Sequence, residues 1–232
     1  VLRRRQRQMC IRDRDTKDTF NSIATVYDKI NDIISLGRHK DWKSFFISNT
    51  DFDGKILDIA TGTGDIISSI KKIYPNTDCY GIDPSKNMLS IAKQKNIGIN
   101  FIEAYSEELP FPENSFDFIT ISFGIRNTLS IDKSLKEIHR VLKKKQNLLV
   151  MEFSRNENFF LKILTNLYLF MIIPIVGLMH GKFKEYFYLS KSISNFYTPK
   201  EFKKLLETNF FLVDSVQSFN FGLVTIYKAK KL

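Results

Sequence analysis

From residue 50 onward, short runs rich in β-branched residues alternate with stretches of helical periodicity. The expected strands cover residues 55–60, 79–83, 100–104, 116–123 and 148–153, and the expected helices cover residues 65–73, 85–95 and 131–143. Such an alternation is typical of parallel strands joined by helical crossovers. We therefore expect an α/β fold built on one sheet.

The end of the chain follows a different pattern. A helix at residues 199–207, with Thr198 as its N-cap, precedes two expected strands at 211–219 and 222–230. The connection between these strands is too short for a crossover, so they must pair antiparallel. The sequence thus predicts a doubly wound, seven-stranded, mostly parallel sheet with an antiparallel last strand.

Two segments lie outside this sheet. Residues 16–48 read as helices that cover one edge of a cleft, because apolar residues recur there at helical spacing. Residues 157–197 form an insertion, and no charge occurs between Ile163 and Met179. A membrane span needs about 20 apolar residues, and this run falls just short. We expect a helical lid over an apolar pocket or on a membrane surface, with a buried pair of core helices as the alternative.

Composition limits the number of domains and the partners. The 232 residues are 43% hydrophobic, enough for one core, and the net charge is +10. Half of that charge comes from residues 1–14, which we exclude as a disordered or non-native basic tail, leaving one domain at 15–232. The tail lacks the apolar segment of a secretory signal. We expect no nucleic-acid partner.

The cysteines and the spacing of polar residues exclude other sites. Cys10 lies in the tail and Cys79 in an expected buried strand, so no disulfide framework is indicated. No metal-ligand spacing is present, and we expect no metal. A reducing cytoplasm fits best.

The run "KILDIATGTGD" places a glycine turn after the first strand. Gly62 and Gly64 let the backbone approach a ligand at the carboxyl end of the strand. The third glycine of a dinucleotide fingerprint would fall at Ile67, which counts against a pyrophosphate. An NAD-dependent oxidoreductase is therefore disfavoured.

The second strand ends at Asp83, a carboxylate suited to both hydroxyls of a ribose. A tight turn and a helix N-cap are the simpler explanation for each motif alone, but the two occur together and in order. Asp58 and Asp65 flank the glycine turn, where an anion site would not have them. S-adenosylmethionine, a nucleoside with a cationic sulfonium and no phosphate, fits this chemistry.

The segments "LDIATGTGD", "GIDPSKNML", "ELPFPENSFDFITISFGIRN" and "YDKINDIISLGRHKDWK" resemble the C-methyltransferases of quinone biosynthesis, which act on demethylmenaquinone and ubiquinone precursors. The resemblance covers about residues 16–230. It implies a Rossmann-like class I methyltransferase fold and S-adenosylmethionine as the cofactor. The glycine turn is generic to such enzymes, whereas "ISFGIRN" and the N-terminal segment are more specific.

The resemblance also implies cofactor contacts. They are expected from Gly62, Thr63 and Gly64, from Asp83, from the pair after the third strand, and from Ser122. That pair is usually Asn-Ala and is Tyr105-Ser106 here, so a stacking contact of Tyr105 could replace adenine-edge contacts. A second departure is Lys144-Lys145-Gln146, where the family commonly has Pro-Gly-Gly.

Arg126 and Asn127 follow the fourth strand directly, at the edge where a substrate ring could meet the methyl group. A ring carbon becomes nucleophilic when its neighbouring hydroxyl is deprotonated, and an arginine with an amide donor could stabilise that oxyanion. We expect Arg126 and Asn127 to be catalytic. Without the resemblance, a surface helix start with ordinary capping would be preferred.

The proton acceptor is less clear from the sequence. Arginine cannot serve as an ordinary base. A water held by Arg126 and Asn127, Tyr27 or His39 could take the proton, and we name Tyr27 as the third catalytic candidate, with a packing role as its alternative. His39 is expected to cap or pack within its helix, and His139 to be structural.

The expected function is methylation of a polyprenyl hydroquinone ring, giving menaquinol from demethylmenaquinol, by a cytoplasmic enzyme peripheral to the inner face of the cell membrane. A ubiquinone precursor or another phenol or heteroatom is the alternative acceptor. The sequence leaves open the quinone pathway, the length of the isoprenoid tail, the general base and the oligomeric state. A homodimer is one oligomeric state that it allows.

Overall fold

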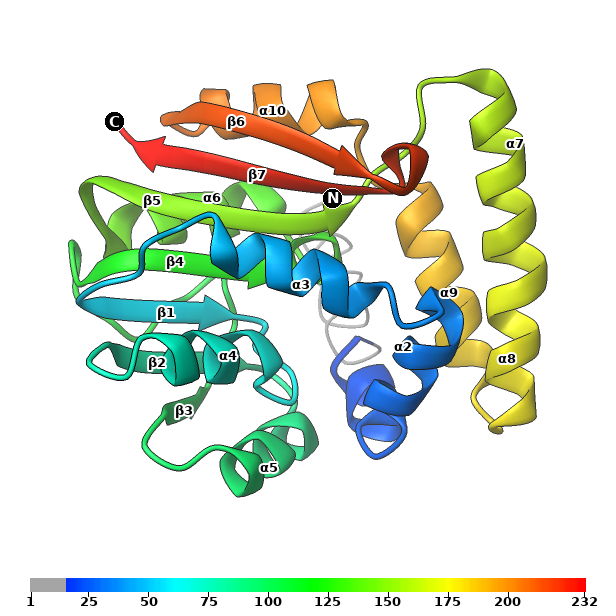
Figure 1. Cartoon of the computed structure of the whole chain (residues 1–232), viewed down its shortest axis with the longest axis horizontal. Coiled ribbons are helices and arrows are strands. Elements are labelled where there is room, and N and C mark those ends of the chain that lie inside the picture. The colour runs from blue at the N-terminus through cyan, green and yellow to red at the C-terminus, as the bar shows by residue number, and fades with distance from the viewer. Residues whose placement is uncertain (1–15) are drawn as a thin grey trace, which may run out of the picture.

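The computed structural model describes residues 16–232, so the expectation of a disordered or non-native tail at 1–14 lies outside it. Its centre is a seven-stranded sheet with strand order β3-β2-β1-β4-β5-β7-β6 (Figure 1). The strands are β1 (Lys55–Ile59), β2 (Asp78–Asp83), β3 (Asn100–Glu103), β4 (Phe116–Ser122), β5 (Leu142–Phe153), β6 (Phe211–Phe219) and β7 (Val224–Lys231).

The pairing confirms the predicted sheet. Strands β1 to β5 pair in parallel, whereas β7 runs antiparallel to both β5 and β6. Only a short 3-10 turn, η3 (Asn220–Gly222), separates β6 from β7, too few residues for a crossover.

Helices cover both faces of the sheet (Figure 1). One face packs against α3 (His39–Ser48), α4 (Asp65–Ile73) and α5 (Lys86–Lys95), and the other against α6 (Ile131–Val141) and α10 (Pro199–Thr208). Successive strand residues point to opposite faces, so Ile56 joins the first cluster and Leu57 the second. Thr198 caps α10 in a capping box, as expected.

One boundary differs from the prediction. Helix α6 ends at Val141 and β5 begins at Leu142, six residues before the expected strand start at Leu148. The early part pairs irregularly, since Leu142 lies opposite Phe116 and Asn147 opposite Phe118. Lys145 takes φ 62°, the conformation that glycine would favour in this bulge. Because residues 143–146 are all polar, the sequence pattern did not indicate that the strand begins at Leu142.

The two segments outside the sheet pack on each other. Residues 16–23 and α2 (Tyr27–Ser35) form, together with α3, the N-terminal cover. The insertion, called the lid below, consists of α7 (Phe159–Leu167), the π-helical stretch η2 (Tyr168–Ile172), α8 (Ile173–Met179) and α9 (Phe183–Ser194). A third apolar cluster joins them, and the Tyr168 hydroxyl donates to the Ile34 carbonyl.

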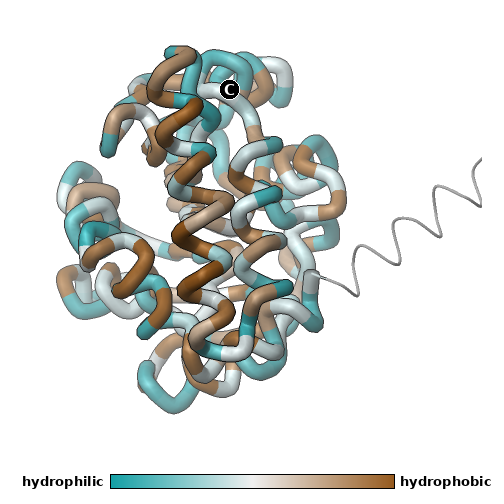
Figure 2. Tube along the Cα trace, turned by 90° about the vertical axis from the view of Figure 1, so that its right-hand side faces the viewer, coloured by the Kyte–Doolittle hydropathy of each residue, from teal (hydrophilic) through white to brown (hydrophobic). Residues whose placement is uncertain are grey.

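The lid has an exposed apolar face. In Figure 2 its long helix faces the viewer and is largely hydrophobic along its length. No residue of α7 is buried, whereas α8 and α9 each bury some of theirs, so the alternative of a buried pair of core helices is wrong for α7. Within the described residues, Phe159–Met179 is the one helix long and apolar enough to cross a membrane, judged by length and composition alone. Its exposed large apolar residues are Phe159, Phe160, Ile163, Leu164, Leu167, Phe170, Met171, Ile172, Ile175, Leu178 and Met179.

Candidate active site

Two adjoining pockets lie at the carboxyl ends of the parallel strands. The strand-tip pocket is lined by residues that include Asp83, Tyr105 and Leu129, and the cover pocket by residues that include His39 and Arg126. They share a wall of residues from the cover and from the ends of β1 and β4: Phe20, Tyr27, Ala60, Gly62, Ser122, Phe123 and Asn127. The cover pocket holds about 1010 Å³ of empty space when the open solvent at its mouth is counted.

The glycine turn opens one side of both pockets. At Gly62, φ is 57° and an added Cβ would meet no atom within 4 Å, so the backbone is open to a ligand. Gly64 lies outside both linings. Its φ is 84°, and an added Cβ would approach Asn96 Nδ2 at 2.7 Å and Ala92 Cβ at 3.3 Å. Gly64 therefore lets the turn pass close to α5.

Asp83 is placed to bind a pair of hydroxyls. Its Oδ2 accepts the Gly62 N–H at 3.0 Å and its Oδ1 accepts the Ser85 N–H at 2.8 Å. The carboxyl is buried, which raises its pKa to about 6 despite the two backbone hydrogen bonds. Each oxygen can accept a further hydrogen bond, as a ribose diol would require.

The carboxylates beside the turn support it. Asp58 accepts hydrogen bonds from Thr61 at 2.6 Å and Thr120 at 2.7 Å, tying β1 to β4, and burial raises its pKa to about 6. Burial would also raise the pKa of Asp65, but Lys43 at 2.9 Å outweighs it and lowers that pKa below its usual value. The turn is thus lined by carboxylates without a cluster of cations.

Two residues predicted to contact the cofactor, Thr63 and Ser106, form hydrogen bonds with the N-terminal cover and with α6. Thr63 Oγ1 donates to Asp28 Oδ1 at 3.0 Å, which fastens the glycine turn to α2. Tyr105 and Ser106 both line the strand-tip pocket, as does Ser122. The Ser106 hydroxyl is hydrogen-bonded to Ser134 Oγ of α6 at 2.8 Å, so its side chain anchors the loop after β3.

Arg126 is buried and paired. Its Nη1 donates to Glu152 Oε1 at 2.5 Å and to the Phe123 carbonyl at 2.7 Å, and its Nε donates to Ser192 at 3.3 Å. Burial raises the pKa of Glu152 and Arg126 beside it opposes the rise. The alternative of a surface helix start is wrong for Arg126, because this residue is only 7% exposed.

Arg126 also keeps donors for a ligand. Among the described residues, no hydrogen bond uses its Nη2, and the side chain lines the cover pocket. Asn127 lines both pockets, and its Oδ1 accepts from the Tyr188 hydroxyl at 3.4 Å. An arginine with an open nitrogen and a neighbouring amide can bind an anionic oxygen.

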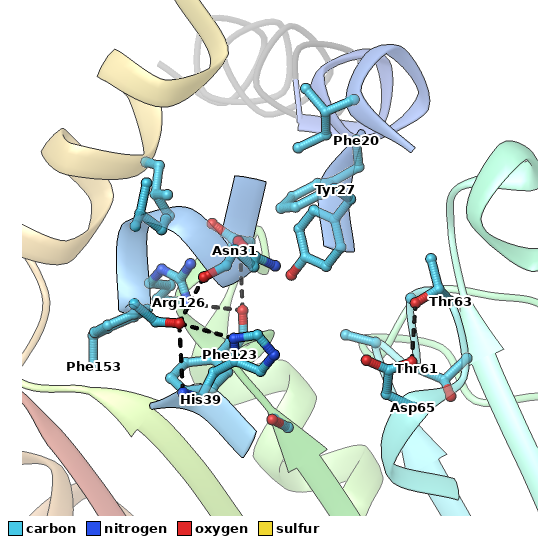
Figure 3. Close-up of a pocket in the computed structure, with 18 of the residues that line it drawn as sticks. Phe20, Tyr27, Asn31, His39, Thr61, Thr63, Asp65, Phe123, Arg126 and Phe153 are labelled. Atoms are coloured by element: carbon cyan, nitrogen blue, oxygen red, sulfur yellow. Dashed lines mark hydrogen bonds between the residues drawn. The ribbon is translucent and has the colours of Figure 1, made fainter. Parts of the chain in front are cut away.

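Tyr27 and His39 reach the cover pocket from the N-terminal cover (Figure 3). Burial raises the pKa of Tyr27, although Lys43 and Arg126 oppose the rise. His39 begins α3 and is also buried, and its Nδ1 lies 2.8 Å from Ser35 Oγ. Both side chains face a cavity that Phe123 and Phe153 also line, with these two ring centroids 4.7 Å apart.

Sequence reasoning missed two partners. Glu152 stands at the end of β5 in "LLVMEFS", where a charged residue inside an apolar strand was the available signal. Asp28 precedes the glycine turn by more than 30 residues, and only the packing of α2 brings it near Thr63. Sequence spacing gives no sign of that contact.

The residues fit S-adenosylmethionine. Asp83 offers lone pairs to a ribose and Gly62 leaves open space. The carboxylates of Asp58 and Asp65 flank the turn, and the nearby Lys43 is paired with Asp65. When bound, S-adenosylmethionine supplies an electrophilic methyl group.

Comparison with known proteins agrees with this geometry. The model of the ubiE/COQ5 methyltransferase family matches residues 8–231. A protein of Rickettsia typhi named ubiquinone/menaquinone biosynthesis C-methyltransferase UbiE is 38% identical over 225 residues, covering 92% of this chain and 91% of its own. A protein of Campylobacter jejuni with the same name is 38% identical over 230 residues, covering 93% and 97%.

Solved structures share the fold at low identity. A chain from the complex of the Haloferax volcanii Trm112 methyltransferase activator with a methyltransferase gives a TM-score of 0.70 at 14% identity, covering 93% of this chain and 96% of that one. A methyltransferase of Aquifex aeolicus gives 0.59 at 19% identity, covering 88% and 98%. The chain is an S-adenosylmethionine-dependent methyltransferase and belongs to the ubiE/COQ5 methyltransferase family.

Proposed function

We propose that this protein methylates a ring carbon of a polyprenyl hydroquinone, with demethylmenaquinol as substrate and menaquinol as product. The observation that carries the proposal is the cover pocket. Aromatic side chains line it, and the buried Arg126 lies beside the wall that it shares with the strand-tip pocket. A flat, apolar ring with an ionisable hydroxyl matches that lining.

In this proposal Arg126 and Asn127 hold the ring oxygen. The open Nη2 of Arg126 donates to the oxygen next to the methylated carbon, and Asn127 adds a second donor. Both donors favour the phenolate, which makes the ring carbon nucleophilic. Tyr27 orients the ring from the cover. Holding the ring against the methyl donor supplies the largest share of the rate enhancement.

The lid serves the isoprenoid tail and the membrane. Its exposed apolar face suits contact with acyl chains, and residues 158–184 contain Lys162, Lys182 and Lys184 but no acidic residue. Such a surface fits an anionic lipid bilayer. The protein then works in the cytoplasm, peripheral to the inner face of the cell membrane, where its lipid substrate resides.

The test is a product assay. The purified protein is incubated with S-adenosylmethionine and either a demethylmenaquinol or a ubiquinone-precursor hydroquinone, and the products are examined by mass spectrometry. We expect one added methyl on a ring carbon of the demethylmenaquinol. Methylation of the ubiquinone precursor alone reassigns the pathway, because curated relatives are named for both quinones. Transfer to neither refutes the proposal. Light scattering on the same sample reports whether the protein is a homodimer.

A further inference from the structure

We infer that His39 accepts the proton that leaves the substrate ring during methylation, and that the nearby Asp32 carboxylate stabilises the imidazolium that forms. This inference rests on the proposed function, since it needs an acceptor carbon that carries hydrogen. It assigns a proton acceptor, a role that neither Arg126 nor Asn127 can fill.

The reaction must release a proton. A bond forms between the ring carbon and the methyl carbon, and the sulfonium C–S bond breaks with its electron pair remaining on sulfur. The ring carbon then loses the hydrogen it carried, and the C–H electrons restore the aromatic ring. A base in the cover pocket has to take that proton.

The hydrogen bonds of Ser35 fix the tautomer of His39. The Ser35 hydroxyl donates its one hydrogen to the Asn31 carbonyl at 2.6 Å, so its oxygen must accept from Nδ1 of His39 at 2.8 Å. Neutral His39 therefore carries its proton on Nδ1, which leaves the lone pair of Nε2 free. The ring lies on the side of the cover pocket that also holds Arg126 and Phe123 (Figure 3).

A carboxylate stands beside Nε2. Nε2 lies 3.6 Å from Asp32 Oδ1, a distance at which a protonated imidazole gains an ion pair. Asp32 also pairs with Lys40 at 2.8 Å. The side chain of His39 is 11% exposed and that of Asp32 is 44% exposed, so the imidazole lies between the enclosed pocket and a partly exposed carboxylate.

The charges around His39 keep it neutral before reaction. Burial lowers its pKa, and Lys43 and Lys40 act in the same direction, while Asp32 and the Asn31 backbone oppose them. Asp65 of α4 also faces the ring across Lys43. Because the pKa of His39 lies below its usual value, the basic form is populated at neutral pH and is lost as the solution becomes acidic.

Other groups in the pocket are less suited. Arginine stays protonated, so Arg126 cannot accept. Burial raises the pKa of Tyr27, so its hydroxyl remains protonated at neutral pH. Asp58 ties β1 to β4 through two threonine hydroxyls, and Asp65 is paired with Lys43. His39 is the group with an unengaged basic lone pair among these.

The experiment compares His39→Gln with His139→Gln, a histidine outside both pocket linings. The substrate is demethylmenaquinol with hydrogen or deuterium at the methylated carbon. We expect His39→Gln to lower kcat by about 100-fold, to retain S-adenosylmethionine affinity, and to gain a primary isotope effect. The control should match the wild type. A His39→Gln enzyme with wild-type kcat and no isotope effect overturns the inference, whereas a wild type that methylates no hydroquinone refutes the proposed function instead.

A second measurement needs no turnover. Nitrogen NMR of the ligand-free protein should show His39 as the Nδ1–H tautomer, titrating below the usual histidine range. Ser35→Ala should shift this tautomer balance and lower kcat less than His39→Gln does. Should His39 be an Nε2–H tautomer in the wild type, the proposed lone pair is absent and the inference fails, even if His39→Gln is too unstable to assay.

Discussion

The guanidinium of Arg126 donates to the carboxylate of Glu152 at 2.5 Å, and both side chains are buried against the fourth and fifth strands. Glu152 also accepts the backbone N–H of Phe153 at 2.8 Å. The Glu152 carboxylate therefore holds the Arg126 guanidinium in place at the edge of the cover pocket. An arginine held in this way needs no rearrangement before it meets a substrate oxygen.

Glu152→Gln should destabilise the fold by about 3–5 kcal/mol, because it leaves the charge of Arg126 buried without its partner. Chemical denaturation measures the change. The double variant Arg126→Met/Glu152→Leu should regain most of the lost stability while remaining inactive. Asp132→Asn, which breaks the exposed pair with Lys136, should change stability by less than about 1 kcal/mol. Equal effects of the buried and exposed substitutions would contradict this account of the buried pair.

Asp83→Asn should weaken S-adenosylmethionine binding by about 10- to 100-fold, since hydrogen bonds to a charged group contribute roughly 1.5–3 kcal/mol. Calorimetric titration measures the affinity. In the wild type the affinity should also fall as the pH drops below about 6, where the Asp83 carboxyl takes up a proton. Asp78→Asn, at the exposed start of the same strand, serves as the control. An Asp83→Asn affinity equal to that of the wild type would rule out a ribose contact here.

The raised pKa of Asp83 has the opposite effect on the ligand-free fold. Its folded-state pKa of about 6 exceeds the ordinary aspartate value of 3.8, so the contribution to stability is full below the lower value and is lost as pH rises through about 6. Relative to Asp83→Asn, whose amide does not ionise, the ligand-free wild type should therefore lose stability as the pH rises from about 4 through about 6. Thermal unfolding across this range tests the sign.

Tyr186→Phe should leave the stability unchanged or raise it. The Tyr186 hydroxyl is buried and has no hydrogen-bond partner among the described residues, so its removal ends a desolvation cost. Tyr74→Phe is the matched control, because the Tyr74 hydroxyl donates to the Thr50 carbonyl at 3.0 Å. That substitution should cost about 0.5–1.5 kcal/mol. A larger loss from Tyr186→Phe would mean that its hydroxyl has a partner after all.

The triple variant Phe160→Glu/Leu164→Glu/Met171→Glu should bind anionic vesicles at least about 100-fold more weakly, because each apolar side chain contributes roughly 1.5 kcal/mol or more when buried in lipid. Vesicle flotation measures binding. The unfolding temperature of the triple variant should equal that of the wild type, since all three residues are exposed. Ile97→Glu, at an exposed apolar residue outside the lid, should bind like the wild type. Unchanged flotation of the triple variant would remove the lid from membrane contact.

Local patterns in the sequence determined the sheet and its ligand edge. The alternation of β-branched runs and helices predicted the doubly wound sheet. The glycine turn after the first strand and Asp83 at the end of the second predicted a nucleoside site, because the carboxyl ends of neighbouring parallel strands meet at one edge of the sheet. The start of β5 was missed, because Lys143 was expected to end a helix and residues 144–146 to form a turn. They lie within β5, at an irregularity between the pairs Leu142–Phe116 and Asn147–Phe118.

Tertiary structure alone decided how the charges in the cover pocket are balanced. Glu152 meets Arg126 because β4 and β5 are neighbours in the sheet, and Ser35 orients His39 only once α2 and α3 fold over the strand ends. The place of Arg126 after β4, together with the family resemblance, made it a candidate catalytic residue. Whether that charge is free or paired depends on which residue of another strand lies beside it, and spacing along the chain does not encode that.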